Sequence, residues 1–360
     1  MAERLRRVAV LPGDDAAPEA VHASLGVLRQ LELPIEWLLL PDGAELAASR
    51  SREDAEKLVR EAADSCDSLL FGATSGKTPG VGYLRWGKQT YANVRPVRWR
   101  PGFNSPLRRP EGIDYVIIRE NVEDLYMGLE GELSELFASG LNLTPRTGLR
   151  SPLTSRDGFY AVKVLTRKNT ERVARFAGRL ARRRREQGHA GKVTCSCKYN
   201  VLPRTDGFFR RTVEAVIRDE FPEIAYEQFI VDDFARRLVA SPHTLDVVLL
   251  PNLYGDILSD EGAGTIGGLG LAPSGCYGDT WAYFESVHGS APDVAGQHTI
   301  NPTATLLSAV LMLDYLGFGE ASHRLDGAIA ATYAAGDRLT PDQGGNASTE
   351  AFAAAVQSRL

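Results

Sequence analysis

Hydrophobic and polar positions alternate in a strand–helix–strand order through the N-terminal part of the chain. Short apolar runs at Val8–Leu11, Ile35–Leu40 and Ser68–Phe71 predict strands, and the amphipathic stretches Pro18–Leu31 and Arg52–Ser65 predict helices between them. This alternation predicts an α/β fold with a parallel sheet and helices on both of its faces. Ligands of such open sheets bind beyond the carboxyl ends of the strands.

The pattern continues after a polar interruption. Further strands are predicted at Asp114–Ile118, Ala161–Leu165, Val193–Cys197 and Leu245–Leu250, with helices over Asn169–Gln187, Gly207–Glu220 and much of the chain from Asn301 onward. Residues about 125–160 are rich in Gly, Ser, Thr and Pro and have no long apolar periodicity. We therefore expect this segment to form a protruding arm or clasp rather than core.

Two aspartates, Asp256 and Asp260, stand one helical turn apart just after the predicted strand Leu245–Leu250. A helix beginning near Gly255 would place both carboxylates on one face. Two carboxylates so close repel each other unless a cation or a proton intervenes, so a hard divalent metal ion is one interpretation. A solvated first helical turn, where acidic residues are favourable, is the other, and the spacing alone leaves both open.

The composition is that of an ordinary soluble protein of about two domains: 360 residues, 43% hydrophobic and 24% charged, with a net charge of −5. This charge argues against nucleic acid as a partner, so the basic run at 182–185 is interpreted as the solvated end of a helix. No apolar stretch is long enough to span a membrane, and the first residues lack the apolar core of a signal peptide, so we expect a cytoplasmic protein. The four cysteines are expected to be reduced thiols.

Three arginines, Arg85, Arg95 and Arg119, each lie beside polar residues at the end of a predicted element. Guanidinium groups bind carboxylates through two parallel hydrogen bonds, so three converging arginines would suit a di- or tricarboxylate. Taken singly, each is more simply explained as an ordinary surface arginine. Their order in the chain, however, belongs to a longer series of motifs.

That series resembles the β-decarboxylating dehydrogenases, which include isocitrate, homoisocitrate, 3-isopropylmalate and tartrate/malate dehydrogenases. The motifs are Arg85-x9-Arg95-Pro96, Arg119-Glu-Asn-Val-Glu-Asp-Leu-Tyr126, Lys198-Tyr-Asn200, Val231-Asp232, Asn252-Leu-Tyr-Gly-Asp-Ile-Leu-Ser-Asp260 and Glu285-Ser-Val-His-Gly-Ser-Ala-Pro-Asp293. The resemblance extends from about residue 8 to the C-terminus. Overall the chain is most similar to the homoisocitrate and isocitrate type.

The resemblance implies a fold of two α/β domains. Residues 1–98 and 268–360 would form a large cofactor-binding domain, and 99–267 a small domain with the arm and a dimer interface. The dinucleotide fingerprint of the classical Rossmann fold is not expected, because the one literal Gly-x-Gly-x-x-Gly, Gly262–Gly267, does not follow a predicted strand. The family's mode of assembly predicts a homodimer with shared active sites.

For catalysis, the resemblance implies an Mg²⁺ or Mn²⁺ ion held by Asp256, Asp260 and the partner subunit's Asp232. An oxygen-rich shell of this kind suits either metal. Lys198, also contributed across the dimer, would be the general base at the C2 hydroxyl, and Tyr126 would protonate carbon after CO₂ leaves. Arg85, Arg95 and Arg119 would bind the substrate.

The cofactor implied is a nicotinamide dinucleotide bound by a loop of small residues after Glu285. The predicted contacts are Thr74, Asn200, Glu285, His288, Gly289, Ser290, Ala291, Asp293 and Asn301. Asp293 favours NAD over NADP, because a carboxylate accepts hydrogen bonds from a ribose 2′-hydroxyl but repels a 2′-phosphate.

The chain departs from the family in two places. The family's Gly-Asp-Gly-Ile-Gly-Pro-Glu opening is here Gly13-Asp-Asp-Ala-Ala-Pro-Glu19, with two glycines replaced. The loop at 75–85, where the family selects the substituent at C3 of the substrate, fits no housekeeping pattern. Lys77 is its only cation before Arg85, which predicts an anionic C3 substituent in contact with Lys77.

The substrate expected from these features is an isocitrate- or homoisocitrate-like acid, including a specialised-metabolism analogue. The alternatives are 3-isopropylmalate and tartrate or D-malate. A different class of function, a non-catalytic regulatory subunit, is disfavoured because all five groups that such subunits lose are present: Tyr126, Lys198, Asp232, Asp256 and Asp260.

Overall fold

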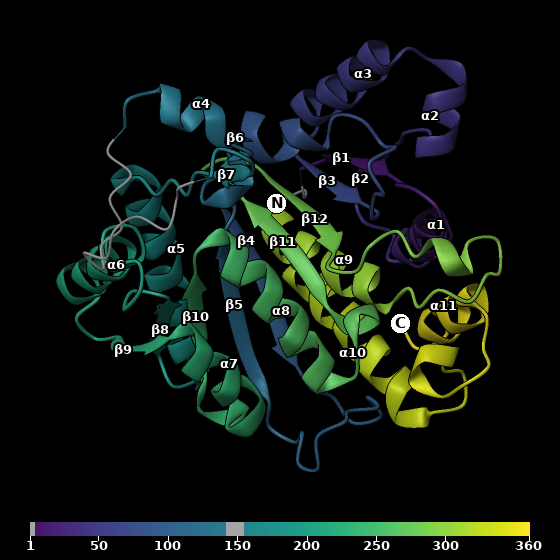
Figure 1. Ribbon diagram of the computed structural model, residues 1–360. Helices are drawn as coiled ribbons and strands as arrows, with labels where there is room; N and C mark the ends of the chain where they lie inside the picture. Colours follow the sequence, from purple (N-terminus) through teal and green to yellow (C-terminus); the bar gives the residue numbers. More distant parts are fainter. Residues whose placement is uncertain (1–3, 142–154) are drawn as a thin grey trace.

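A single twisted sheet of ten strands runs through the computed structural model, which describes residues 4–141 and 155–360 (Figure 1). The strand order is β2-β1-β3-β12-β11-β4-β5-β10-β8-β9. The strands are β1 (Arg6–Leu11), β2 (Ile35–Leu39), β3 (Ser68–Phe71), β4 (Ala92–Arg98), β5 (Asp114–Glu120), β8 (Lys192–Cys197), β9 (Ala225–Ile230), β10 (Val247–Leu250), β11 (Pro273–Tyr277) and β12 (Ala282–Ser286).

The centre of the sheet is antiparallel, which corrects the all-parallel expectation. The pairs β12–β11, β11–β4 and β4–β5 are antiparallel, whereas the pairs on either side are parallel. The physical reason lies in the connections. No helix joins β4 to β5, and a short turn joins β11 to β12, whereas parallel neighbours need a long crossover.

Helices cover both faces of the sheet. They are α1 (Ala17–Arg29), α2 (Gly43–Ser49), α3 (Arg52–Ser65), α5 (Arg167–Glu186), α6 (Asp206–Glu220), α7 (Val231–Ala240), α8 (Asn252–Ile266), α9 (Thr303–Leu316), α10 (Gly319–Ala335) and α11 (Thr349–Gln357). Side chains alternate along β5, so Val116 and Ile118 pack with α5 and α6, while Ile117 packs with α7 and α8. Ser51 and Thr166 cap α3 and α5 by accepting hydrogen bonds from the first helical turn.

Most predicted elements are confirmed to within a few residues, with three differences. The helix carrying the paired aspartates begins at Asn252 rather than near Gly255. Four strands of the main sheet and two of the helices that cover it were not predicted: β4, β9, β11, β12, α2 and α7. The predicted strand Ala161–Leu165 is wrong, because β7 (Phe159–Ala161) ends where that strand was to begin, and only an isolated bridge joins Val164 to Asp124.

The arm is built from short elements within the predicted segment. The strands β6 (Glu130–Glu132) and β7 form a two-stranded antiparallel sheet. Helix α4 (Leu133–Ala138) comes directly after β6 in the chain. Residues 142–154 of the predicted arm lie outside the described residues. Among the described helices, none is long and apolar enough to cross a membrane.

The proposed division at residues 98/99 and 267/268 stays a prediction. The main sheet crosses this boundary between β4 and β5, and one hydrophobic cluster contains side chains from both parts. The glycine motif Gly262–Gly267 lies in and at the end of α8, with no strand before it in the Rossmann position, as expected. All four cysteines are buried and free.

Each arginine of the basic run 182–185 on α5 contacts a carboxylate or a backbone carbonyl oxygen. The contacts are Arg182 with Glu223, Arg183 with Asp314, Arg184 with Asp246 and Asp114, and Arg185 with the backbone oxygen of Glu223. Each guanidinium group therefore already serves the fold at this helix end.

Candidate active site

A row of polar side chains crosses one face of the sheet where β5, β4 and β11 meet. Arg119 on β5 lies directly opposite Asn93 on β4, which lies opposite Cys276 on β11. Directly opposed residues share a face, so these side chains point to the same side. Helix α8 covers this face closely at Gly255, where a Cβ atom would lie 2.7 Å from Cβ of Arg119. The glycine therefore allows the first turn of α8 to approach the arginine.

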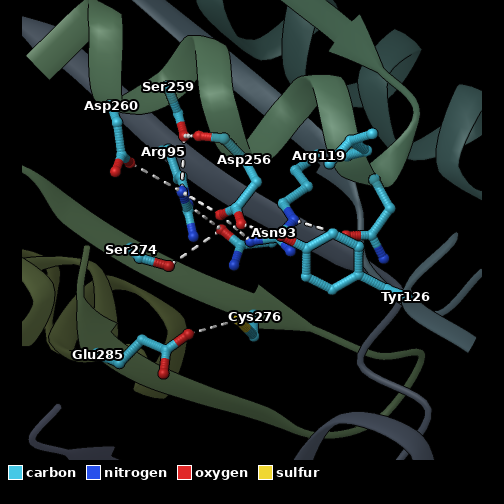
Figure 2. A network of polar contacts seen from close by, with 12 residues as sticks. Asn93, Arg95, Arg119, Tyr126, Asp256, Ser259, Asp260, Ser274, Cys276 and Glu285 are labelled. Carbon is cyan, nitrogen blue, oxygen red and sulfur yellow. Dashed lines mark hydrogen bonds and ion pairs between the residues drawn. The ribbon is translucent and has the colours of Figure 1, made fainter. Parts of the chain in front are cut away.

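The paired aspartates on α8 face the arginines of the sheet (Figure 2). Arg119 donates through Nε to Asn252 Oδ1 at 2.8 Å and through Nη1 to Asp256. Arg95 Nη1 lies 3.2 Å from Asp256 Oδ1 and 3.5 Å from Asp260 Oδ1. One guanidinium group thus reaches between carboxylates that are a helical turn apart, as the one-face prediction requires.

Tyr126 and Arg85 complete the cluster from two separate segments. The Tyr126 hydroxyl donates to Asp256 Oδ2, and its ring centroid lies 4.6 Å from Arg119 Cζ and 5.9 Å from Arg85 Cζ. Arg85 lies on the π-helical turn η1 (Tyr83–Gly87), a rare element that is frequent at functional sites. The structure therefore brings together all three arginines that the sequence singled out.

The two aspartates differ in electrostatic environment. Burial raises the pKa of Asp256, but Arg119, Tyr126 and Arg95 outweigh it and hold that pKa below its usual value. Burial dominates at Asp260, whose pKa is raised despite Arg95. Burial and then the hydrogen bond to Asp256 raise the pKa of Tyr126, so its hydroxyl stays protonated at neutral pH.

Several donors in the cluster point at no acceptor. Arg119 Nη2 and Asn93 Nδ2 are buried and have no hydrogen-bond partner among the described residues. A buried polar group without a partner costs free energy, so such groups usually mark a place for a ligand or water. Because both groups are donors and Arg119 is charged, an anionic acceptor group fits this place.

Lys198 and Asp232 lie apart from this cluster and contact each other. Lys198 follows β8, Asp232 lies in the first turn of α7, and the two form an ion pair that lowers the pKa of Asp232. Their side chains are 32% and 67% exposed. Within the described residues no group of three or more His, Cys, Asp or Glu side chains could hold a metal ion. Within this part of the chain, the carboxylates that converge at the site are those of Asp256 and Asp260.

These two carboxylates fit a hard divalent cation in part. Carboxylate oxygen is the donor that Mg²⁺ and Mn²⁺ prefer, and burial raises the pKa of Asp260 although Arg95 lies close to it. A full shell requires further oxygen ligands from a bound acid or a second chain.

The predicted cofactor loop follows β12. Within it, Ser290 is buried, Asp293 is exposed on the turn η5 (Pro292–Val294), and Ala291 has a positive φ of 52°. Burial lowers the pKa of His288, whose Nε2 is buried and without a partner among the described residues. Gly289 is exposed, and its position has open space where a Cβ would lie.

The other predicted cofactor contacts are scattered. Glu285 on β12 accepts a hydrogen bond from Cys276 Sγ at 3.5 Å (Figure 2), and Asn200 lies in the turn after β8. The Asn301 side chain is buried and already bonded, donating to Tyr333 and Asp342. An adenine contact of Asn301 would have to displace one of these bonds, and its role stays a prediction.

The loop at 75–85, called the specificity loop below, is held by the turn that contains Asp14 and Asp15. Thr74 Oγ1 donates to Asp14, and the ammonium group of Lys77 lies 2.7 Å from Asp15 Oδ1. Hydrogen bonding to Asp15 raises the pKa of Lys77. The only cation predicted to meet the substrate from this loop is therefore neutralised by an ion pair.

The sequence argument missed the supporting residues of the site. Asn93 positions Arg95, accepting from its Nε at 3.2 Å, and Ser259 accepts from Arg95 Nη1 at 2.6 Å. Asn93 could have been found from its spacing. It lies two positions before Arg95 on the same face of a strand whose other positions are mostly apolar.

Comparisons with known proteins agree with this geometry. The family model described as isocitrate/isopropylmalate dehydrogenase matches residues 7–356. The chain is 42% identical to a 3-isopropylmalate/3-methylmalate dehydrogenase of Methanocaldococcus jannaschii, covering 99% of both chains. It is 41% identical to an isocitrate/homoisocitrate dehydrogenase of Thermus thermophilus, covering 98% of both. The crystal structure of isocitrate dehydrogenase from Methylococcus capsulatus superposes with a TM-score of 0.82 at 30% identity, over 98% of this chain and 99% of that one.

Proposed function

Because the chain belongs to the isocitrate/isopropylmalate dehydrogenase family, a family of decarboxylating dehydrogenases, we propose that it oxidises a 2-hydroxy acid with a carboxylate at C3, using NAD and Mg²⁺ or Mn²⁺. The products would be a 2-oxo acid, CO₂ and NADH. The observation that carries this proposal is the convergence of Arg85, Arg95 and Arg119 on the carboxylate pair of α8 beside Tyr126.

The arginine cluster supports binding of the substrate carboxylates. In this cluster, Arg119 Nη2 and Asn93 Nδ2 are buried donors without an acceptor among the described residues, and a carboxylate between them would accept from both. Arg85 approaches the same place from η1. Burial and the two neighbouring arginines lower the pKa of Arg119 to about 10, which is the expected result of packing like charges where an anion binds.

The proposed metal ligands are Asp256, Asp260 and Asp232 of the partner subunit. A divalent ion held there would act as a Lewis acid at the C2 oxygen and stabilise negative charge as CO₂ leaves. The side chain of Asp260 is about half exposed, and its ion pair with Arg95 is long, at 3.5 Å. Its oxygens are therefore available to a cation. Asp232 is exposed on the first turn of α7, as a ligand donated to another chain must be.

Two residues would move protons. Lys198 of the partner subunit would take the C2 hydroxyl proton while hydride passes from C2 to C4 of the nicotinamide ring. The bond from C3 to its carboxylate then breaks, and its electron pair remains on the substrate. Tyr126, whose hydroxyl stays protonated at neutral pH, would donate a proton to C3. Its ring, close to both Arg85 and Arg119, is well placed for this step.

Exposed apolar side chains support the proposed homodimer. Ile257 on α8 is 57% exposed and Val239 on α7 is 43% exposed, and these two helices contact each other. Phe159 on the arm strand β7 is 82% exposed. Exposed apolar residues gathered on adjacent elements favour association, and a second chain packed there would cover them.

The proposal of NAD depends on Asp293. The carboxylate is exposed on η5, where it is free to meet a ribose hydroxyl, and it would repel a 2′-phosphate. Family members differ in this choice, so the cofactor requires a direct test.

The substituent at C3 has two candidate classes. The sequence predicted an anionic group held by Lys77, but this ammonium group is paired with Asp15. With that charge neutralised, the neighbouring side chains of Pro79 and Val81 favour a small apolar substituent, as in 3-methylmalate or 3-isopropylmalate. An anionic substituent would have to share the ammonium group of Lys77 with Asp15. The near-equal identities to relatives of both substrate types do not separate the two classes.

One assay tests the function and the substituent together. NADH formation would be followed with Mn²⁺ and a panel of malates carrying hydrogen, methyl, isopropyl, carboxymethyl or carboxyethyl groups at C3. Turnover of any member with release of CO₂ supports the reaction, and the best substrate identifies the class. Absence of turnover with every member and either dinucleotide would refute the proposed function.

A further inference from the structure

Asp15 joins two loops that the proposed function assigns to different ligands. Its Oδ1 lies 2.7 Å from the ammonium nitrogen of Lys77, in the specificity loop. Its Oδ2 accepts a hydrogen bond of 2.6 Å from the hydroxyl of Ser290, in the cofactor loop. Lys77 and then Ser290 hold the pKa of Asp15 at about 2, so the carboxylate is charged throughout the physiological range. One side chain therefore bridges segments that are far apart in the sequence.

The backbone conformation at Asp15 is unfavourable for a residue with a side chain. Its φ is 55°, in the left-handed region that favours glycine. Glycine would fit the turn without strain, but it would remove both contacts. Neighbouring Gly13, with φ 88°, has no such freedom, because a Cβ there would lie 2.3 Å from the backbone oxygen of Ala73. The turn itself does not require an aspartate at position 15, and the side chain of Asp15 supplies the contacts to Lys77 and Ser290.

The specificity loop is tied to the same turn through Asp14. This buried carboxylate accepts hydrogen bonds from the backbone N–H groups of Ser75 at 2.8 Å, Lys77 at 3.1 Å and Thr78 at 3.2 Å. On the other side, the N–H of Ala16 donates to the backbone oxygen of Ser290 at 3.0 Å. Displacement of residues 14–16 therefore acts on both loops, and the Asp15 side chain is the one direct link between Lys77 and Ser290 among these contacts.

We propose that Asp15 is a positioning residue that couples dinucleotide binding at residues 288–293 to ordering of the specificity loop. The inference rests on the proposed function, because it takes 288–293 as part of the cofactor site. A dinucleotide that fixes Ser290 also fixes Asp15, which then holds Lys77 and the segment leading to Arg85. Coupling is reciprocal, so a substitution that loosens the specificity loop should also weaken dinucleotide binding.

Hydrogen exchange measured by mass spectrometry tests this without a substrate. In the wild-type enzyme, saturating NAD⁺ should slow exchange in peptides covering 286–293 and also in those covering 74–83. The N–H groups that donate to Asp14 are the reporters, with an expected slowing of about fivefold or more. In Asp15→Gly, which suits the backbone conformation, slowing should persist in 286–293 and be lost in 74–83.

A second variant keeps the test valid if Asp15→Gly folds poorly. Lys77→Met should weaken NAD⁺ affinity by about fivefold in calorimetry, although Lys77 is outside the cofactor loop. The matched control is Lys57→Met on α3, which removes an equally exposed lysine from a surface pair with Glu61 and should leave NAD⁺ affinity unchanged.

The outcomes separate this inference from the proposed function. If the wild-type protein binds neither NAD⁺ nor NADP⁺, the cofactor assignment fails. If NAD⁺ binds and protects 286–293 alone, or if Asp15→Gly retains protection of 74–83, the coupling role of Asp15 is overturned. Unchanged NAD⁺ affinity in Lys77→Met would likewise contradict it, whereas equal losses in Lys77→Met and Lys57→Met would show a non-specific charge effect and overturn it too.

Discussion

Replacement of Lys163 by methionine should destabilise the protein more than any other loss of a single lysine contact described above. Lys163 Nζ lies 2.7 Å from Asp206 Oδ1 and 3.4 Å from Asp124 Oδ1, and both carboxylates are fully buried. The lysine side chain is only 12% exposed and also stacks near the ring of Tyr254. Methionine keeps most of the length of the lysine side chain but leaves two buried carboxylates without their cation.

The expected cost follows from that burial. Removing one partner of a buried ion pair typically costs about 3–5 kcal/mol, a large part of the roughly 5–15 kcal/mol that stabilises a domain. The matched control is Lys192→Met. Lys192 pairs with Glu227 at 2.9 Å, but the two side chains are 19% and 31% exposed, so we expect a loss of about 1 kcal/mol or less. Both are to be measured by urea unfolding at one protein concentration, because the stability of a protein that associates depends on its concentration.

The same change should lower catalysis. Asp124 accepts the N–H of Leu253 at the start of α8, and Asp206 accepts the N–H of Lys198 at 2.8 Å. Disturbing these carboxylates should therefore misplace α8, which carries the proposed metal ligands, and Lys198, the proposed base, so kcat should fall more than KM rises. Lys163→Arg should recover part of both losses. A stability loss no larger than that of Lys192→Met, or unchanged kcat, would refute the reasoning.

Three further predictions concern the site itself. Because of Asp293, kcat/KM with NAD should exceed that with NADP by at least about tenfold, or about 1.4 kcal/mol; equal values would contradict the assignment. Asp256→Asn should lower turnover by about a hundredfold or more and weaken Mn²⁺ binding in calorimetry, while circular dichroism stays unchanged; normal Mn²⁺ affinity would remove Asp256 from the ligand set. Mixing inactive Lys198→Ala and inactive Tyr126→Phe subunits should restore activity at one site per heterodimer, and heterodimers without activity would exclude shared sites.

Much of the fold was predictable because its signals are local. Apolar runs and amphipathic periods located most strands and helices, and the i, i+4 spacing of Asp256 and Asp260 correctly placed both on one helix face. Pairing direction at the centre of the sheet was not predictable, because it depends on the paths of the connections rather than on residue patterns. The strand predicted at Ala161–Leu165 failed for a related reason. These residues flank Lys163, and they make one isolated β-bridge, from Val164 to Asp124, instead of pairing as a strand.

Charge partners were the least predictable part of the site. The interpretation of Lys77 assumed a free ammonium group, but its partner Asp15 stands 62 positions earlier in the chain. The buried carboxylates Asp124 and Asp206 could not be distinguished by sequence from the many solvated acids around them. Only the fold brings them to Lys163, because ion pairs between distant segments leave no periodic signal.

The separation of Lys198 and Asp232 from Asp256 follows from strand order. Lys198 follows β8 and Asp232 follows β9, whereas Arg119 and Tyr126 belong to β5 and the segment after it, with β10 in between. The chain leaving β10 forms α8, whose aspartates turn towards β4 and β5, away from β8. In this arrangement Lys198 and Asp232 contact each other, and β10 separates their strands from β5. The side chains of Lys198 and Asp232 are 32% and 67% exposed, and the neighbouring helices α7 and α8 expose the apolar side chains of Val239 and Ile257. In the proposed homodimer, a two-fold pairing on this surface would let each chain supply Lys198 and Asp232 to the site of the other.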